Sequence, residues 1–145
     1  MTAISNLKDL TQTTYDSVEG YRRAIDKAES AALKSALERR LSAREMTLRN
    51  LNNALEGRGE ERIDSTSMSG KAHHTFLGIA DAFADGNDAA VERVEEGEDY
   101  LVGEFKDAMD GDLGKDADLR GVVEQAYQEV REGERFSDML EKQYS

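Results

Sequence analysis

The sequence predicts an all-α protein, built as an antiparallel bundle of four long helices with one additional short helix. Apolar residues recur at steps of three and four through every long segment, which is the pattern of a helix face turned toward a core. The 145 residues include no proline, the residue that most often interrupts a helix. No segment alternates between apolar and polar residues as a strand does. We expect a single domain that spans residues 1–145.

The first two long helices are predicted from two apolar stripes that do not share one register. The first stripe begins at Ile4 and continues to Ala28, beyond which the same register falls on polar residues. Apolar residues return in a rotated register from Leu37 onward. We therefore expect the chain to turn near residues 30–34, although neither glycine nor proline marks the turn. The second helix should end at residues 56–59, where Gly57 suits the end of a helix.

The second half of the chain predicts the short helix and two further long ones. The short helix should run over residues 67–84, until the Asp-Gly-Asn-Asp sequence of residues 85–88 breaks it. The next helix should continue to about Met109, and a glycine-containing turn should follow at residues 110–114. The last helix carries an apolar stripe from Leu119 to Leu140. Four long helices of similar length pack most simply as an antiparallel bundle, with the short helix as a crossover or end cap.

The composition excludes several classes of function. There are 31 acidic and 19 basic residues, for a net charge of −12. This excess disfavours nucleic acids and anionic membrane surfaces, both of which attract basic proteins. No stretch approaches the roughly 20 apolar residues that a membrane-spanning helix needs. The chain has no cysteine, which excludes disulfides and thiolate metal sites. Because the N-terminus also lacks the pattern of a signal peptide, we expect a soluble cytoplasmic protein.

Two charged residues stand where the apolar stripes should have hydrophobic ones. Arg44 lies in the middle of the stripe of the second helix, and Glu98 lies in the middle of the stripe that runs from Val91 to Phe105. A charge buried alone is costly, so each must find a partner inside the protein. We predict that the Arg44 guanidinium contacts a carboxylate of the helix that ends near Met109, with Glu98 as the best candidate.

Further acidic residues allow an alternative interpretation, a carboxylate-rich metal site for iron or manganese. Glu95 lies at the edge of the same helix face as Glu98, with the helix-disfavoured Gly97 between them. Glu134 flanks the core face of the last helix, and His73 lies on the apolar face of the short helix. We favour the structural interpretation, a buried ion pair with solvated carboxylates around it. The candidate metal ligands are Glu95, Glu98, Glu134 and His73, with Glu29 as a further one.

Several short sequences also carry a resemblance to a known family. They are residues 16–22 in the first helix, Arg44 in the second, residues 67–73, the Glu-Glu-Gly-Glu-Asp sequence at 95–99, and Tyr127. With these features the chain resembles an uncharacterised bacterial four-helix-bundle family of the ferritin-like superfamily, a domain of unknown function. The resemblance covers nearly the whole chain, and the pattern at residues 95–99 is its most specific part.

The resemblance implies a ferritin-like fold and raises the question of a di-iron centre. Such a centre takes a Glu from each of two helices and a Glu-x-x-His motif from each of the other two. This sequence contains no Glu-x-x-His, and it has Glu134 where relatives tend to have a histidine on the last helix. Arg44 occupies the region where the second helix would supply a ligand.

We therefore expect a non-catalytic, ferritin-like bacterial protein of unknown role, stress-related by analogy with other ferritin-like proteins. The first alternative is a carboxylate-rich metal-binding protein or a diverged di-iron oxidase. The second is a protein-interaction module that presents a helix face to a partner. Helix faces outside the core could also pair two copies into a homodimer. The sequence identifies no other protein partner.

Overall fold

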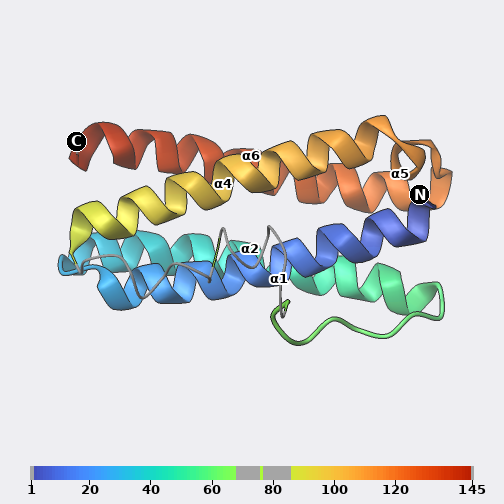
Figure 1. Cartoon of the computed structure of the whole chain (residues 1–145), viewed down its shortest axis with the longest axis horizontal. Helices are drawn as coiled ribbons and strands as arrows, with labels where there is room; N and C mark the ends of the chain where they lie inside the picture. Colours follow the sequence, from blue (N-terminus) through green and yellow to red (C-terminus); the bar gives the residue numbers. More distant parts are fainter. Residues whose placement is uncertain (1, 68–75, 77–85, 145) are drawn as a thin grey trace.

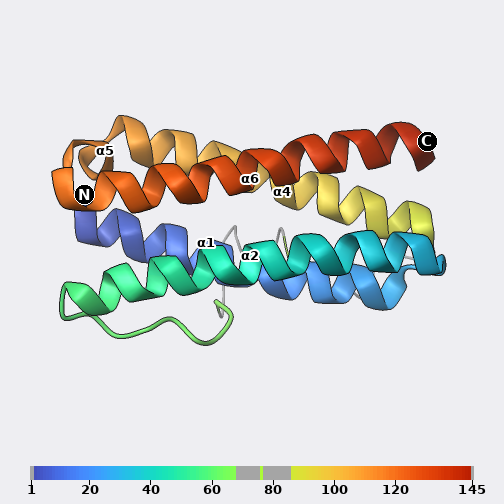
Figure 2. The same ribbon diagram turned by 180° about the vertical axis from the view of Figure 1, so that it is seen from behind.

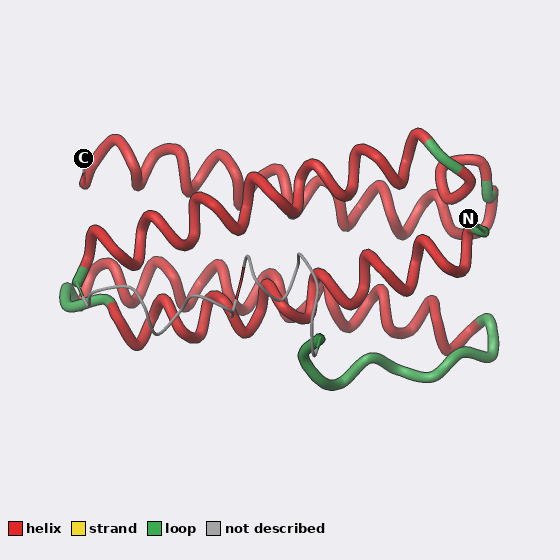
Figure 3. Tube along the Cα trace, in the orientation of Figure 1, coloured by secondary structure: helices red, strands yellow, loops and turns green. Residues whose placement is uncertain are grey.

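The computed structural model describes residues 2–67, residue 76 and residues 86–144. Helices take up more than three quarters of these residues, and none of them lies in a strand (Figure 3). The prediction of an all-helical protein is confirmed. The helices are α1 (Ala3–Lys27), α2 (Ala31–Gly57), α4 (Asn87–Asp110), α5 (Asp112–Lys115) and α6 (Ala117–Tyr144).

The four long helices lie side by side as two hairpins, α1 with α2 and α4 with α6 (Figure 1). Helix α1 packs on both α2 and α4, and α6 packs on both α4 and α2. Each helix runs antiparallel to these two neighbours, because the chain reverses within each hairpin (Figure 1). Helix α2 ends at the opposite end of the molecule from the start of α4.

The turn between α1 and α2 lies at residues 28–30, so the predicted position near residues 30–34 is wrong by a few residues. Ser30 caps α2, because its side chain accepts a hydrogen bond from the Leu33 amide at 3.2 Å. The amide oxygen of Asn87 accepts from the backbone N–H groups of Glu29 and Ser30, at 2.8 and 3.0 Å. The turn is thus held by a residue that is far away in the sequence.

The glycine-rich turn predicted at residues 110–114 contains the short helix α5. Leu113 within it is fully buried, which anchors this single turn of helix in the core. Gly114 makes the close approach possible, since a Cβ atom there would lie 1.8 Å from the Met109 carbonyl oxygen. The short helix predicted over residues 67–84 lies outside the described residues, except for Ser67 and Phe76.

The hydrophobic core is divided into two clusters along the bundle. One is built around Leu7, Leu51 and Phe105, and the other around Ala24, Leu37 and Val91. Between them lie buried polar residues from the long helices, and these form the site described next. Within the described residues, no helix is long and apolar enough to cross a membrane.

Candidate functional site

An arginine and a glutamate form an ion pair at the centre of the bundle. Arg44 on α2 and Glu98 on α4 have side chains that are 0% and 1% exposed. The guanidinium is bidentate, with Nη1 2.7 Å from Glu98 Oε1 and Nη2 2.8 Å from Glu98 Oε2. Bidentate arginine–carboxylate pairs are the strongest and most directional of the common ion pairs. The structure thus brings together the two charged residues that interrupt the apolar stripes.

Glu129 on α6 is a second carboxylate partner of Arg44, and the sequence analysis missed it. Its Oε1 accepts from Arg44 Nε at 2.8 Å, and its Oε2 accepts from Arg44 Nη2 at 3.2 Å. Arg40 Nη2 also donates to Glu129 Oε2, at 2.5 Å. A signal was present, because on a helical wheel Glu129 lies about 40° from Gly133, at the flank of the buried face that Ala126 and Gly133 share.

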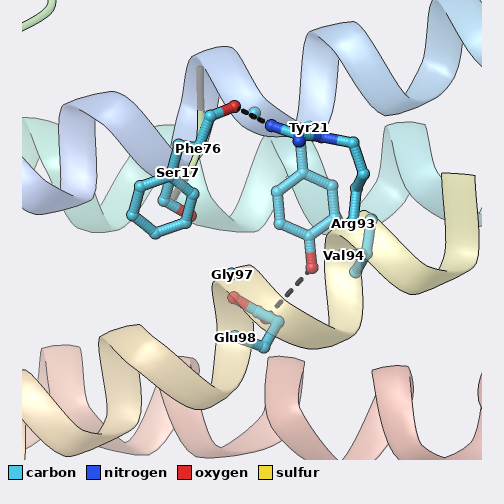
Figure 4. Close-up of a pocket in the computed structure, with 8 residues that line it drawn as sticks. Ser17, Tyr21, Phe76, Arg93, Val94, Gly97 and Glu98 are labelled. Atoms are coloured by element: carbon cyan, nitrogen blue, oxygen red, sulfur yellow. Dashed lines mark hydrogen bonds between the residues drawn. The ribbon is translucent and has the colours of Figure 1, made fainter. Parts of the chain in front are cut away.

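Two residues of α1 complete the cluster. Ser17 Oγ accepts from Arg44 Nη1 at 2.6 Å, and the Tyr21 hydroxyl donates to Glu98 Oε2 at 3.0 Å (Figure 4). The Tyr21 ring also lies 5.6 Å from the guanidinium carbon of Arg44, within cation–π range. With Ser17, Glu98 and Glu129 as acceptors, all five N–H groups of Arg44 make hydrogen bonds. We call Arg44, Glu98, Glu129, Ser17 and Tyr21 the charge cluster.

Gly133 is the position that lets α6 close over the charge cluster. A Cβ atom at Gly133 would lie 1.7 Å from Glu98 Oε2 and 2.7 Å from Arg44 Nη2. No side chain larger than hydrogen fits there without displacing the ion pair. The absence of a side chain at Gly133 therefore makes room for Glu98 and Arg44.

The electrostatics of the cluster favour the charged forms of Arg44 and Glu129 and the neutral form of Tyr21. Burial opposes the charged form of Arg44, but the carboxylates of Glu98 and Glu129 outweigh it and raise the guanidinium pKa above its usual value. Burial likewise opposes ionisation of Glu129, but Arg44 and Arg40 outweigh it and lower the pKa of that carboxyl. Burial raises the pKa of Tyr21, and the negative charge of Glu98 raises it further. The cluster therefore places the Arg44 guanidinium between the carboxylates of Glu98 and Glu129, and Arg40 contacts Glu129 from outside the cluster.

Gly97 makes room for a different side chain, the ring of Phe76. A Cβ atom at Gly97 would lie 2.7 Å from Phe76 Cε1, and one at Gly20 would lie 3.2 Å from Phe76 Cδ1. The backbone oxygen of Phe76 accepts from Arg93 (Figure 4). The aromatic ring of Phe76 thus approaches Gly97 closely and covers the charge cluster on its α1–α4 side.

The predicted metal ligands do not form one set in the described residues. Glu98 is held by Arg44 and Tyr21, whereas Glu95 groups with Asp99 and Asp138 on the α4–α6 seam. In that group one carboxylate oxygen from each residue lies within 4.8 Å of the others. We call Glu95, Asp99 and Asp138 the seam carboxylates.

Burial raises the pKa of Glu95 to about 8, and its hydrogen bond with Asp138 contributes. Burial also raises the pKa of Asp99, helped by the charge of Glu134 and a hydrogen bond with it. Glu134 therefore lies beside the seam carboxylates and not in the charge cluster. His73 lies outside the described residues. Glu29 lies in the turn at the end of the α1–α2 hairpin, away from these carboxylates.

One family model matches the chain, over residues 2–111, and it describes a domain of unknown function (DUF2383). The chain belongs to this family. The matched range includes α1, α2 and α4 and therefore Ser17, Tyr21, Arg44 and Glu98, while Glu129 and Gly133 lie beyond it. No curated protein matches the chain, and no solved structure does.

Proposed function

We propose that this chain is a non-catalytic, ferritin-like bundle protein in which the charge cluster takes the place of a metal centre. The proposal also holds that the protein is cytoplasmic and does not bind nucleic acid, which its net charge of −12 supports. Its main support is the Arg44 guanidinium, which is completely buried at mid-bundle and makes hydrogen bonds with all five N–H groups. Bundle proteins build their cofactor sites at this position, from side chains on facing helices.

The charge of Arg44 opposes a metal centre at this depth. A divalent cation about 4 Å from the guanidinium would be repelled by about 8 kcal/mol at an effective dielectric constant of about 20. Glu98 already accepts three hydrogen bonds, from Arg44 and Tyr21. A metal would have to displace these donors and separate the buried Arg44–Glu98 pair, which costs about 3–5 kcal/mol. The cluster is therefore suited to holding the four long helices in one arrangement.

Calorimetric titration of untagged protein with ferrous iron, under anaerobic conditions, tests the proposal. We expect no tight uptake that depends on Glu98, and no oxygen consumption when air is admitted. Manganese should behave in the same way. Tight binding of two irons per chain, lost in Glu98→Gln but kept in Glu104→Gln, would overturn the proposal in favour of a diverged di-iron oxidase. Glu104 is the matched control because it lies on the same helix, outside the cluster.

The seam carboxylates favour a second candidate function, the weak binding of one hard divalent cation. Three carboxylate oxygens within 4.8 Å of one another suit such an ion, with water completing its coordination shell. Because the pKa of Glu95 is about 8, binding should displace a proton from Glu95 and strengthen as the pH rises through 8.

Manganese titration, followed by the paramagnetic resonance of the free ion, tests this second candidate. Asp138→Asn should weaken binding at least about tenfold, because it removes one anionic ligand. Asp107→Asn is the control, since it makes the same chemical change on α4 outside the seam. Equal loss in the two variants would show only general attraction of cations to an acidic protein.

A further inference from the structure

The two sequence motifs, residues 16–22 and 95–99, contain residues that neither the charge cluster nor the seam carboxylates use. Among them are Asp16 and Gly20 on α1 and Gly97 on α4. All three lie against residues of the chain between α2 and α4, which Asp16 meets at Ser67 and the two glycines meet at Phe76. The motifs therefore have a second purpose beside the charge cluster.

Asp16 binds Ser67 through both oxygens of its carboxylate. Its Oδ1 accepts from the Ser67 backbone N–H at 3.0 Å, and its Oδ2 accepts from the Ser67 hydroxyl at 2.5 Å. Gln12 donates from Nε2 to Asp16 Oδ1 at 3.3 Å and to the backbone oxygen of Ser65 at 2.9 Å. Asp16 is 0% exposed, so these donors take the place of water around its carboxylate. Residue 67 is thereby fixed on α1.

Phe76 lies in a slot between two glycines that face each other from α1 and α4. A Cβ atom at either Gly20 or Gly97 would press on the ring, which is why both positions carry no side chain. Phe76 is buried, its ring centroid lies 6.0 Å from that of Tyr100, and Arg93 donates to its backbone oxygen (Figure 4). The ring is therefore held on both faces and at its backbone.

The Phe76 ring covers the charge cluster on the α1–α4 face, which lies in front in Figure 1. Beside the ring is a cavity of about 10 Å³, lined in part by Ser17, Tyr21 and Glu98. One buried water needs about 10–15 Å³, so the ring leaves space for about one at most. On the opposite face, where α2 and α6 lie in front in Figure 2, the backbone of α6 approaches the ion pair at Gly133. A helix covers one face and an aromatic ring covers the other.

From these contacts we propose that Asp16, Gly20 and Gly97 form a docking site for the chain's own residues 67 and 76, and that the docked Phe76 ring keeps water out of the charge cluster. The inference rests on the proposed function, because it concerns the ion pair that takes the place of a metal centre. Water at the cluster would compete for the hydrogen bonds of Arg44 and raise the local dielectric constant, which weakens a buried ion pair.

Solvent exchange of the Arg44 guanidinium protons, followed by heteronuclear NMR, tests the proposal. Phe76→Ala removes the ring, and Gly97→Ala displaces it by placing a Cβ atom 2.7 Å from Phe76 Cε1. Both variants should exchange these protons at least about tenfold faster than wild type, because exchange requires water to reach the guanidinium. Gly103→Ala is the matched control on α4, since its Cβ atom would meet nothing within 4 Å. It should exchange within about twofold of wild type.

The contact between Asp16 and Ser67 is tested in the same way. Asp16→Ala releases Ser67 and should also speed the exchange of the Arg44 protons. Asp9→Ala makes the same chemical change on α1 at an exposed position and should leave the exchange unchanged. Equal exchange in these two variants would remove Asp16 from the docking site.

Urea denaturation of each variant separates entry of water from general loss of stability. Alanine is the better helix former, so Gly103→Ala should be slightly more stable than wild type. In Phe76→Ala and Gly97→Ala the rise in exchange should exceed the rise in the equilibrium constant for unfolding. Wild-type exchange in either variant, or a rise that unfolding alone explains, would overturn the proposal, and Gly97→Ala decides alone if Phe76→Ala does not fold. Because no metal is used, tight iron uptake by the wild-type protein would refute the proposed function separately.

Discussion

The substitution Gly133→Ala adds a single methyl group where α6 meets the charge cluster. In an ordinary helix interior this change stabilises the protein by up to about 1 kcal/mol, because glycine is a poor helix former. Here the new Cβ would lie 1.7 Å from Glu98 Oε2, 2.7 Å from Arg44 Nη2 and 2.9 Å from Glu98 Cδ. These atoms belong to a buried ion pair between α2 and α4 that is also held by residues of α1 and α6, so they cannot simply move aside.

The magnitude follows from two opposing contributions. Separating a buried ion pair costs about 3–5 kcal/mol, because the freed charges remain in the interior. The gain in helix propensity offsets about 1 kcal/mol of this. We expect Gly133→Ala to lower the free energy of unfolding by about 2–4 kcal/mol. For a domain of this size each kcal/mol corresponds to about 2–4 °C in the melting temperature.

Urea denaturation followed by far-ultraviolet circular dichroism measures the effect. Gly121→Ala is the control on the same helix, because a Cβ atom at Gly121 would meet nothing within 4 Å. It should raise stability by about 0.5–1 kcal/mol, so the two substitutions should differ in sign. If Gly133→Ala is as stable as wild type, the reasoning about the approach of α6 to the ion pair is refuted.

Three further predictions concern the same charged groups. Arg44→Ala should cost about 3 kcal/mol or more in urea denaturation, because it leaves Glu98 buried without its cation, and the double variant Arg44→Leu with Glu98→Leu should recover much of that loss. The lowered pKa of Glu129 means that the folded state binds its proton less readily than the unfolded state. The ionised Glu129 therefore stabilises the folded state fully above its unfolded-state pKa of about 4.3, and this stabilisation is lost as the pH falls through the lowered pKa. The Glu129→Gln variant should show a flatter dependence of the free energy of unfolding on pH in this acidic range. The raised pKa of Glu95 has the opposite effect, because the folded state holds its proton more tightly. The free energy of unfolding should therefore decrease as the pH rises from about 4.3 to about 8. Carbon-detected NMR should place the titration midpoint of the Glu95 carboxyl near 8. A midpoint near 4 would contradict the burial of Glu95 at the α4–α6 seam.

The helices themselves follow from local information. Each long helix shows its apolar face as a periodic stripe, and the absence of proline lets these stripes run without interruption. The same periodicity shows that Arg44 and Glu98 occupy core positions, because each replaces an apolar residue in a stripe. A charge at such a position needs an opposite charge, which is why these two residues could be paired on the sequence alone.

Only the tertiary structure decided which other groups join Arg44 and Glu98. Glu129 lies at the flank of its helix face, where a glutamate is usually solvated, and it turns inward because Arg44 and Arg40 reach it from α2. Glu95 and Glu98 are one helical turn apart, yet they face different neighbours, because α6 presents Asp138 to one while α2 presents Arg44 to the other.

The ends of the helices also depend on tertiary contacts that the local sequence does not reveal. The turn at residues 28–30 is held by Asn87, and α5 forms where the burial of Leu113 outweighs a glycine-rich sequence. Periodicity along one helix reveals which face is buried, because burial selects residue types within that helix. It does not reveal which atoms of another helix meet that face, since this depends on how the helices are rotated and shifted against one another.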